Sequence, residues 1–232
     1  MAKDDTVVGR FSRDQLFQMI EEQPPRFAGE TIEIFDSVRY VEIEPFIQEY
    51  FWEDQGSVPL GQIVGVSDAS CRGLTWQEFL QRGRRMDLNL VLLEQNPEYY
   101  GGSPEKKSLS YLRIDDGGYY AYPDGEHRTC IAKFFGFFNQ VEALQGVTVS
   151  LCRLDHEALA LFHVLQARGF HVRAVRRKLG REDNPGWMRE TFAVEFEIGV
   201  NGQKLMFDRE EARQILARPQ GWWSRFLKRL GN

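Results

Sequence analysis

The pattern of hydrophobic and polar positions predicts a chain in which helices and strands alternate. Ser12 and Gln15 form a capping box that opens a first helix, with Leu16 and Ile20 on its apolar face. The next three segments are each predicted from a different signal: alternation of apolar and polar residues for the first, aromatic content for the second and glycine content for the third. They are a half-buried strand pair over 30–44, a short helix over 45–52, and a loop or irregular strand over 54–69.

The middle of the chain carries the clearest local signals. Thr75 and Glu78 form a second capping box, which predicts a helix to about Arg85. The nearly continuous apolar run 88–94 is typical of a strand buried on both faces. A polar loop over 96–107 follows, in which Tyr99 and Tyr100 are candidates for stacking on a base or for simple packing. The next expected elements are a hairpin of 109–114 with 119–122, a buried helix over 129–138 and a strand over 147–154.

Beyond residue 154 the pattern predicts a helix, a strand, a hairpin and two more helices. Asp155 caps the first helix and Gly169 ends it. A strand over 170–179 has Val172, Ala174 and Leu179 facing inward. The hairpin over 189–208 turns at Asn201-Gly202. Asp208 and Glu211 cap a helix that Pro219 stops, and residues 222–230 form a basic amphipathic helix suited to docking, to a partner or to a membrane surface.

The sequence Asp124-Gly-Glu-His-Arg128 carries the most concentrated chemistry in the chain. It lies where a predicted strand becomes a helix, and the N-terminus of a helix attracts anions such as phosphate. Arg128 offers a bidentate fork to phosphate oxygens, Glu126 suits a metal ion or a general base, and His127 titrates near neutral pH. The same residues also suit an ordinary helix start, because acidic side chains are common in a first turn.

This turn resembles the ParB/sulfiredoxin superfamily. Partition proteins carry Gly-Glu-Arg-Arg at the corresponding turn and sulfiredoxins carry Gly-Cys-His-Arg, so Glu126 takes the place of the sulfiredoxin cysteine. The resemblance covers about residues 31–154. It implies an α+β fold with a ParB/sulfiredoxin-like core over 30–168. An N-terminal helical arm, 1–29, precedes this core, and a β-hairpin plus helix extension, 169–232, packs on it. Cys130, inside the helix, is expected to pack and not to reduce sulfinic acid.

The overall plan is most like the plasmid fertility-inhibition proteins of the Osa and FiwA type. That resemblance implies an ATPase and DNase that blocks transfer of conjugating DNA through a type IV secretion system. Asp124, Gly125, Arg128 and Thr129 would bind ATP or another nucleoside triphosphate, and Glu126, His127 and Arg128 would be catalytic. Asp124 and Glu126 would hold Mg²⁺ or Mn²⁺. DNA is the expected partner, with the relaxase or secretion components as further candidates.

Two alternatives belong to other functional classes. One is a nucleotide-gated, partition-like DNA-binding protein without nuclease activity. The other is a non-enzymatic inhibitor that binds a secretion component.

A basic stretch over 168–181 contains no acidic residue and is the candidate for contacts with DNA. Its predicted DNA-binding residues are Arg173, Arg176, Arg177 and Lys178. The alternative role is to keep the edge of a sheet from aggregating. A basic group at Arg82, Arg84 and Arg85 is read in the same two ways, as a helix end or as phosphate contacts. His156 and His163 are seven residues apart but have no third ligand beside them.

Composition narrows the functional classes only slightly. The 232 residues contain 29 Lys and Arg against 34 Asp and Glu, and the net charge of −5 argues against a protein coated in nucleic acid but permits a local basic groove. The three cysteines have no metal-binding spacing and suggest reduced thiols. No apolar run spans a membrane and no signal peptide is visible, so a cytoplasmic location is expected.

Overall fold

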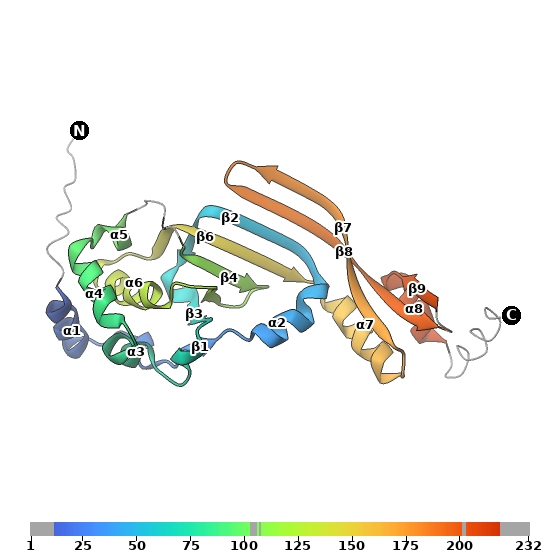
Figure 1. The fold of residues 1–232 in the computed structure, drawn as a ribbon, viewed down its shortest axis with the longest axis horizontal. Coiled ribbons are helices and arrows are strands. Elements are labelled where there is room, and N and C mark those ends of the chain that lie inside the picture. The colour runs from blue at the N-terminus through green and yellow to red at the C-terminus, as the bar shows by residue number, and fades with distance from the viewer. Residues whose placement is uncertain (1–11, 103–105, 107, 201–202, 219–232) are drawn as a thin grey trace. The chain divides into compact units, whose positions relative to one another are not determined.

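The computed structural model describes residues 12–102, 106, 108–200 and 203–218 of the chain. These residues form an α+β fold with eight α-helices and a mixed sheet of nine strands (Figure 1). The predicted α+β class is therefore confirmed, whereas a ParB/sulfiredoxin-like core stays a prediction. Contacts divide the chain into two compact units, 1–36 with 52–150 and 37–51 with 151–232. The predicted division into 1–29, 30–168 and 169–232 stays an expectation.

Helix α6 (Glu126–Asn139) forms the centre of the first unit, and α1, α3, α4 and α5 all contact it. Its side chains Cys130, Ile131, Phe134 and Phe135 are at most 1% exposed. The predicted buried helix and the packing role of Cys130 are thus confirmed. The helices around it are α1 (Arg13–Glu22), α3 (Trp76–Arg82), α4 (Met86–Gln95) and α5 (Glu98–Gly101), with short 3₁₀ turns at Arg26–Gly29, Leu60–Gln62 and Ala69–Cys71.

The strands that lie wholly or mainly in the first unit follow the order β1-β3-β5-β4-β6-β2, and residues 47–51 of β2 and 151–154 of β6 belong to the second unit. Their bounds are β1 (Glu33–Ile34), β2 (Ile47–Pro59), β3 (Ile63–Val66), β4 (Ser110–Ile114), β5 (Tyr119–Ala121) and β6 (Ala143–Leu154). β3 pairs in parallel with both β1 and β5, and β4 and β5 form the predicted antiparallel hairpin. The predicted strand over 147–154 is confirmed as part of β6. Both capping boxes of this unit, at Ser12 and at Thr75, are also confirmed.

Lys133 places a cation in the core of the first unit. Its side chain is 4% exposed, and its ammonium donates to the carbonyls of Leu60 (3.0 Å) and Ile63 (2.8 Å). The same nitrogen lies 4.8 Å from the ring centre of Phe27 and 4.9 Å from that of Trp76. These contacts satisfy the donors of a buried ammonium, while burial lowers the pKa of Lys133 to about 8.

The prediction of a strand over 88–94 is wrong, because these residues belong to helix α4. The buried positions of this apolar run follow the spacing of a helix, because Met86, Leu90 and Leu93 are buried, whereas Leu88 and Leu92 are about 60% exposed. A continuous apolar run fits a buried strand and a packed helix equally well by periodicity alone. The loop predicted over 96–107 contains the short helix α5, and residues 103–105 and 107 lie outside the described part of the chain.

The predictions between residues 30 and 59 are also wrong in large part. In 30–44 only Glu33–Ile34 is a strand, and Ser37–Ile43 is helix α2, with Val38 and Val41 71% and 66% exposed. The predicted helix over 45–52 is instead a 3₁₀ turn, Glu44–Phe46, followed by strand β2. For β2 the sheet decides the outcome, because strand preference measures the fit of side chains to a sheet more than a backbone tendency, whereas no residue of α2 is buried. In the segment 54–69, predicted as a loop or irregular strand, Ile63–Val66 forms strand β3, and the residues up to Pro59 belong to β2.

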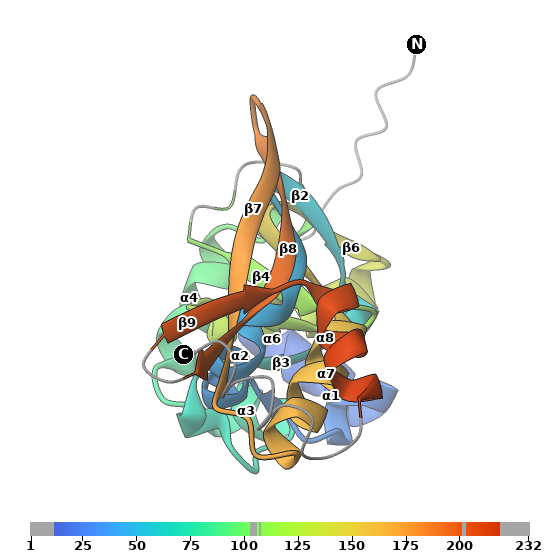
Figure 2. The ribbon, with the colours of Figure 1, turned by 90° about the vertical axis from the view of Figure 1, so that its right-hand side faces the viewer.

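The second unit is built on a long antiparallel hairpin (Figure 2). β7 (Val172–Asn184) pairs with β8 (Trp187–Val200), and β8 pairs with β9 (Gln203–Phe207). Helices α7 (His156–Ala167) and α8 (Arg209–Ala217) contact each other. The core of the unit contains Phe46, Ala158, Leu165, Ala174, Val194, Phe196, Ile198, Ala212 and Ile215.

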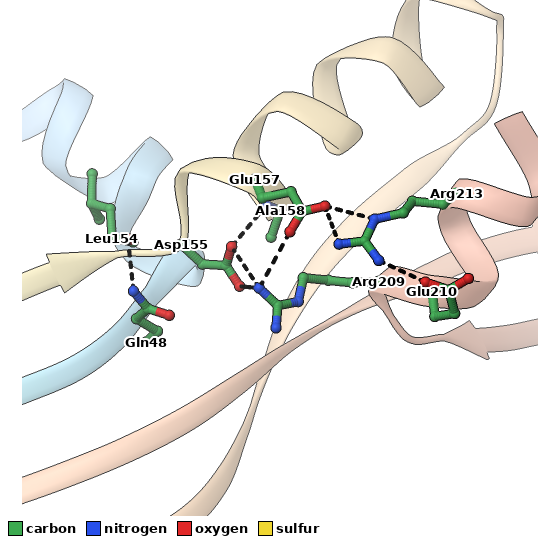
Figure 3. A network of polar contacts seen from close by, with 8 residues as sticks. All are labelled: Gln48, Leu154, Asp155, Glu157, Ala158, Arg209, Glu210 and Arg213. Atoms are coloured by element: carbon green, nitrogen blue, oxygen red, sulfur yellow. Dashed lines mark hydrogen bonds and ion pairs between the residues drawn. The ribbon is translucent and has the colours of Figure 1, made fainter.

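An ion-pair network joins the start of α7 to α8 within this unit (Figure 3). Asp155 is 6% exposed, caps α7 by accepting from the Ala158 N–H at 2.9 Å, and receives Arg209 at 3.1 Å. Arg213 then pairs with Glu157 and with Glu210. Asp155 is the buried member of this network, so loss of its partner Arg209 would leave an uncompensated charge, whereas Arg213, Glu157 and Glu210 are about half exposed and contribute less.

Most sequence predictions for the second unit are confirmed. Asp155 caps α7, Asp208 and Glu211 form the capping box of α8, and β8 with β9 is the expected hairpin. The inward placement of Leu179 is wrong: this side chain is 59% exposed, because the register shifts between Lys178 and Gly180 and ends the alternation. The turn at 201–202, Pro219 and the tail 222–230 lie outside the described residues.

Two further expectations concern the whole described chain. Cys71, Cys130 and Cys152 are free and buried, as the sequence suggests. Among the described residues, no helix combines the length and the apolar character that crossing a membrane requires.

Candidate functional site

Gly125 makes the sharp connection between β5 and α6 possible. Its φ of 111° lies in the left-handed region that favours glycine. A Cβ at this position would lie 2.3 Å from Cδ1 of Leu109, so a larger residue meets both backbone strain and a steric clash. Thr129 N–H donates to the Gly125 carbonyl at 2.8 Å as the first bond of α6. The predicted turn from strand to helix is therefore confirmed.

Glu126 places its carboxylate at the start of its own helix. The Gly125 N–H donates to Oε2 of Glu126 at 3.1 Å and to Oδ1 of Asp124 at 2.7 Å. The pKa of Glu126 falls to about 2, chiefly because His127 donates to its carboxylate and also because backbone N–H groups do. The anion held at the start of α6 in this structure is thus the protein's own carboxylate.

His127 has an acceptor at each ring nitrogen. Nδ1 lies 3.1 Å from Oε1 of Glu126, and Nε2 lies 2.5 Å from the carbonyl oxygen of Arg84. Carboxylate and carbonyl oxygens only accept hydrogen bonds here, so both ring nitrogens must donate, and only the imidazolium has two N–H groups. The hydrogen bond from Glu126 accordingly raises the pKa of His127. His127 is a donor in this arrangement and not a ready base.

Arg128 lies in the first turn of α6, with its guanidinium directed to several oxygens. Nη2 donates to the Ser108 carbonyl at 2.7 Å and lies 3.8 Å from Oδ2 of Asp124, and Nη1 is 3.4 Å from the Tyr99 hydroxyl. The side chain of Arg128 is 25% exposed, so solvent still reaches it. These contacts hold the planar guanidinium beside the start of the helix, and a phosphate would compete with the Ser108 carbonyl and the Tyr99 hydroxyl for its donors.

Thr129 faces the core. It is completely buried, and its hydroxyl is hydrogen-bonded to that of Tyr111 at 2.8 Å. Its N–H is used inside the helix. The structure therefore gives this residue a packing role, and a nucleotide contact through it stays a prediction.

A charged cleft of about 260 Å³ lies on the His127 side of the turn. We define the charged cleft by its lining residues, Asp68, Ser70, Phe79, Arg84, Arg85, Glu126 and His127. The guanidinium groups of Arg84 and Arg85 form no hydrogen bond or ion pair with other described residues. With the His127 imidazolium, the cleft brings three cations against two carboxylates, so its local charge is positive and suits an anion.

A second hollow, of about 610 Å³, lies on the Arg128 side. We call it the amide cleft, and its lining residues are Asn89, Leu92, Gln95, Asn96, Tyr99, Tyr100 and Arg128. Arg128 is the one charged side chain in this set, and three of the others are carboxamides. Both clefts thus border the first turn of α6, one charged and the other nearly neutral.

Sequence reasoning missed Asn89, Gln95, Asn96, Asp68 and Ser70 as members of these clefts. The carboxamides were hidden by the wrong assignment of 88–94 to a strand, because only a helix places positions 89, 92, 95 and 96 on one face. The sequence predicts Arg84 and Arg85 as a helix end or as phosphate contacts, and the structure places both in the charged cleft.

The predicted DNA-binding residues lie on β7 in the second unit, and three of the four are ion-paired there. Arg176 pairs with Glu44 at 2.8 Å, Arg177 with Glu195, and Lys178 with Glu190. Arg173 is exposed. Exposed pairs of this kind contribute about 0–1 kcal/mol, so a DNA phosphate can compete for the cations, but the carboxylates reduce the positive field of the strand.

The donor set for a divalent metal consists of Asp124 and Glu126. No group of three or more His, Cys, Asp and Glu side chains within the described ranges is arranged to hold a metal ion. Mg²⁺ at nucleotide sites typically takes one or two carboxylates together with substrate phosphates and water. Asp124 is 69% exposed, and both carboxylates accept from the same N–H group, so they lie close together. This pair fits such a shared Mg²⁺ or Mn²⁺ site.

No family model, no curated protein and no solved structure matches the chain.

Proposed function

We propose that the chain binds a nucleoside triphosphate, ATP first, at the start of α6 and hydrolyses its terminal phosphate. The observation that carries the proposal is the gathering of cations around one turn. Arg84, Arg85 and the His127 imidazolium line the charged cleft, and Arg128 lies in the same turn of α6. A triphosphate carries about four negative charges and needs a cluster of donors of this kind.

Each residue of the turn then has a distinct task. Arg128 holds phosphate oxygens through its fork, and His127 donates a hydrogen bond where negative charge develops. Glu126 keeps His127 protonated and in place. Asp124 and Glu126 would hold Mg²⁺ or Mn²⁺, which when bound offsets phosphate charge and polarises the bond that breaks.

Cleavage of DNA and inhibition of conjugative DNA transfer extend this proposal. Their support is the resemblance of Asp124–Arg128 to the ParB/sulfiredoxin turn, together with the basic residues of β7. Hydrolysis of a phosphodiester needs the same kinds of groups as hydrolysis of a triphosphate: donors for the phosphate charge and carboxylates for a metal ion. The relaxase and components of a type IV secretion system are the corresponding candidate partners.

One observation favours a second function, nucleotide-gated DNA binding without nuclease activity. Glu126, with a pKa of about 2, is a weak base, and His127 donates through both ring nitrogens. A general base works best when its pKa is near the working pH. In this alternative the turn binds nucleotide and does not cleave DNA. A non-enzymatic inhibitor acting through the tail 222–230 depends on residues outside the described part of the chain.

The test measures the binding of ATP and CTP and the release of phosphate from them with Mg²⁺ or Mn²⁺, in parallel with degradation of linear DNA. Arg128→Gln and Glu126→Gln are compared with wild type. Arg82→Gln is the matched control, because Arg82 is 63% exposed, pairs with Glu78 and lines neither cleft. We expect both activities in wild type and in Arg82→Gln, and a loss of at least tenfold in the other two.

The outcomes separate the candidate functions. Nucleotide binding with intact DNA would favour the gated DNA-binding protein. A wild-type protein that binds neither nucleotide would refute the phosphate site. Equal losses of activity in Arg82→Gln and Arg128→Gln would show that the activity depends on the general positive charge of the protein and not on the turn.

A further inference from the structure

We propose that the amide cleft is the nucleoside site, in which the base and sugar of the nucleotide lie between α4, α5 and Arg128. This inference rests on the proposed function, because it assigns the part of the same ligand that the charged cleft does not fit. It adds a set of specificity-determining residues that lie outside the Asp124–Arg128 turn.

The size and the chemistry of the amide cleft suit a nucleoside. Its volume of about 610 Å³ falls within the range of roughly 300–1,000 Å³ that small-molecule sites occupy. A nucleic-acid base is planar and neutral, and its edge alternates hydrogen-bond donors and acceptors. A carboxamide offers two donors and one acceptor, so Asn89, Gln95 and Asn96 can complement such an edge without adding charge.

These carboxamides also have hydrogen-bonding capacity to spare. Nδ2 of Asn89 donates to the Arg85 carbonyl at 2.9 Å, which orients the side chain. The side chains of Gln95 and Asn96 make no hydrogen bond with other described residues. Both residues are exposed at the C-terminal end of α4. Their donors and acceptors therefore face water, which a ligand can replace at little cost.

Tyr99 provides an aromatic surface that the protein has already ordered. Its ring packs edge-on against Tyr100, with the ring centres 5.0 Å apart, and the Lys106 ammonium lies 5.3 Å from its centre. Its hydroxyl is 3.4 Å from Nη1 of Arg128. Tyr100 is in turn 5% exposed and packs on Phe135 of α6. A ring fixed in this way loses little entropy when a base stacks on it.

Arg128 connects the nucleoside part to the phosphate part. It lines the amide cleft, yet its guanidinium is 3.8 Å from Asp124, directly before α6. Since Arg128 also belongs to the first turn of α6, it would contact a phosphate attached to a sugar in the amide cleft. The charged cleft, on the other side of the turn, offers Arg84 and Arg85 to the phosphates beyond it.

The test compares binding of ATP, CTP, GTP and UTP with binding of inorganic tripolyphosphate, by calorimetry with Mg²⁺. The variants are Gln95→Leu/Asn96→Leu, which changes exposed side chains only, and Tyr99→Leu, which removes the aromatic ring. Gln18→Leu is the control, since Gln18 is an exposed carboxamide on α1 outside the cleft. Circular dichroism checks that each variant is folded.

We expect wild type to bind at least one nucleotide more tightly than tripolyphosphate. Gln95→Leu/Asn96→Leu should bind that nucleotide about tenfold more weakly and lose the preference among bases, and Tyr99→Leu should weaken all four nucleotides about tenfold. Tripolyphosphate affinity should be the same in Gln95→Leu/Asn96→Leu as in wild type, and Gln18→Leu should behave as wild type. Tyr99→Leu also removes the hydroxyl that contacts Arg128, so in this variant the affinity for nucleotides should fall by more than the affinity for tripolyphosphate.

Two results would overturn the assignment, and they differ in what they leave standing. If tripolyphosphate binds as tightly as the nucleotides, or if the two cleft variants keep wild-type affinities and base preference, the nucleoside lies elsewhere while the phosphate site survives. If neither tripolyphosphate nor any nucleotide binds to wild type, the proposed function fails and the nucleoside assignment fails with it.

Discussion

The ion pair of Glu126 with His127 should make a measurable, pH-dependent contribution to the stability of the first unit. Glu126→Gln keeps the shape of the side chain and removes its charge. The pKa of Glu126 is lowered from 4.5 to about 2, and each pH unit corresponds to about 1.36 kcal/mol, so the carboxylate form is stabilised by about 3 kcal/mol. The Glu126 side chain is 14% exposed, so solvent screens this interaction only in part.

The sign of the pH dependence follows from both partners. A carboxyl group whose pKa is lowered in the folded state stabilises above pH 4.5, and this contribution is lost as the pH falls toward 2. An imidazole whose pKa is raised stabilises below pH 6.5, and its contribution is lost as the pH rises through the folded pKa. The contribution of the pair is therefore greatest between about pH 4.5 and 6.5.

The assay is native-state hydrogen exchange of the amides of α6, which reports the opening of the first unit separately from the second. At pH 5.5 we expect Glu126→Gln to lower the opening free energy by about 2–3 kcal/mol, and at alkaline pH the difference should shrink. NMR titration of the His127 imidazole should show its pKa falling toward 6.5 in the variant. Equal differences at both pH values, or an unchanged His127 titration, would refute the imidazolium pair.

Three further predictions concern other parts of the structure. Gly125→Ala should lower the stability of the first unit by about 1–3 kcal/mol in the same exchange assay, because of the positive φ at this position and the contact with Leu109. A Gly125→Ala variant as stable as wild type would contradict the turn geometry. The pKa of Lys133 is about 8 in the folded state, below its unfolded value, so the unfolded state binds more protons between pH 8 and 10.5 and the stability of wild type should rise with pH in that range. Lys133→Met should abolish this rise, and a variant that keeps it would refute the lowered pKa of Lys133. Asp155→Ala removes the cap of α7 and leaves Arg209 without its buried partner, so exchange of the α7 amides should show that the opening free energy falls by at least about 2 kcal/mol. A fall of less than about 0.5 kcal/mol would mean that the network is not formed in solution.

The sequence itself determined the elements whose signals are local. The capping boxes at Ser12, Thr75 and Asp208 depend on side chains three residues apart, and each begins a helix as predicted. The turn at Gly125 is local in the same sense, since a glycine between a strand and an apolar helix needs no distant partner to be recognised. The candidate chemistry of residues 124–128 could therefore be located from sequence.

Only the tertiary structure decided the elements whose identity depends on burial. The apolar residues of α4 fit two periods, and the side chains that become buried select the helical one. The same dependence hid the amide cleft, because Asn89 and Gln95 share a surface only once α4 is a helix.

The protonation of His127 and the pairing of the charged side chains also depend on the tertiary structure. His127 is held as an imidazolium by Glu126, its neighbour in sequence, and by the carbonyl of Arg84, which is 43 residues away. The cations of β7 are opposed by carboxylates such as Glu195 on the facing strand. A sequence shows which charges a chain carries, but the distances that set their pKa values and their pairing exist only after distant segments have packed together.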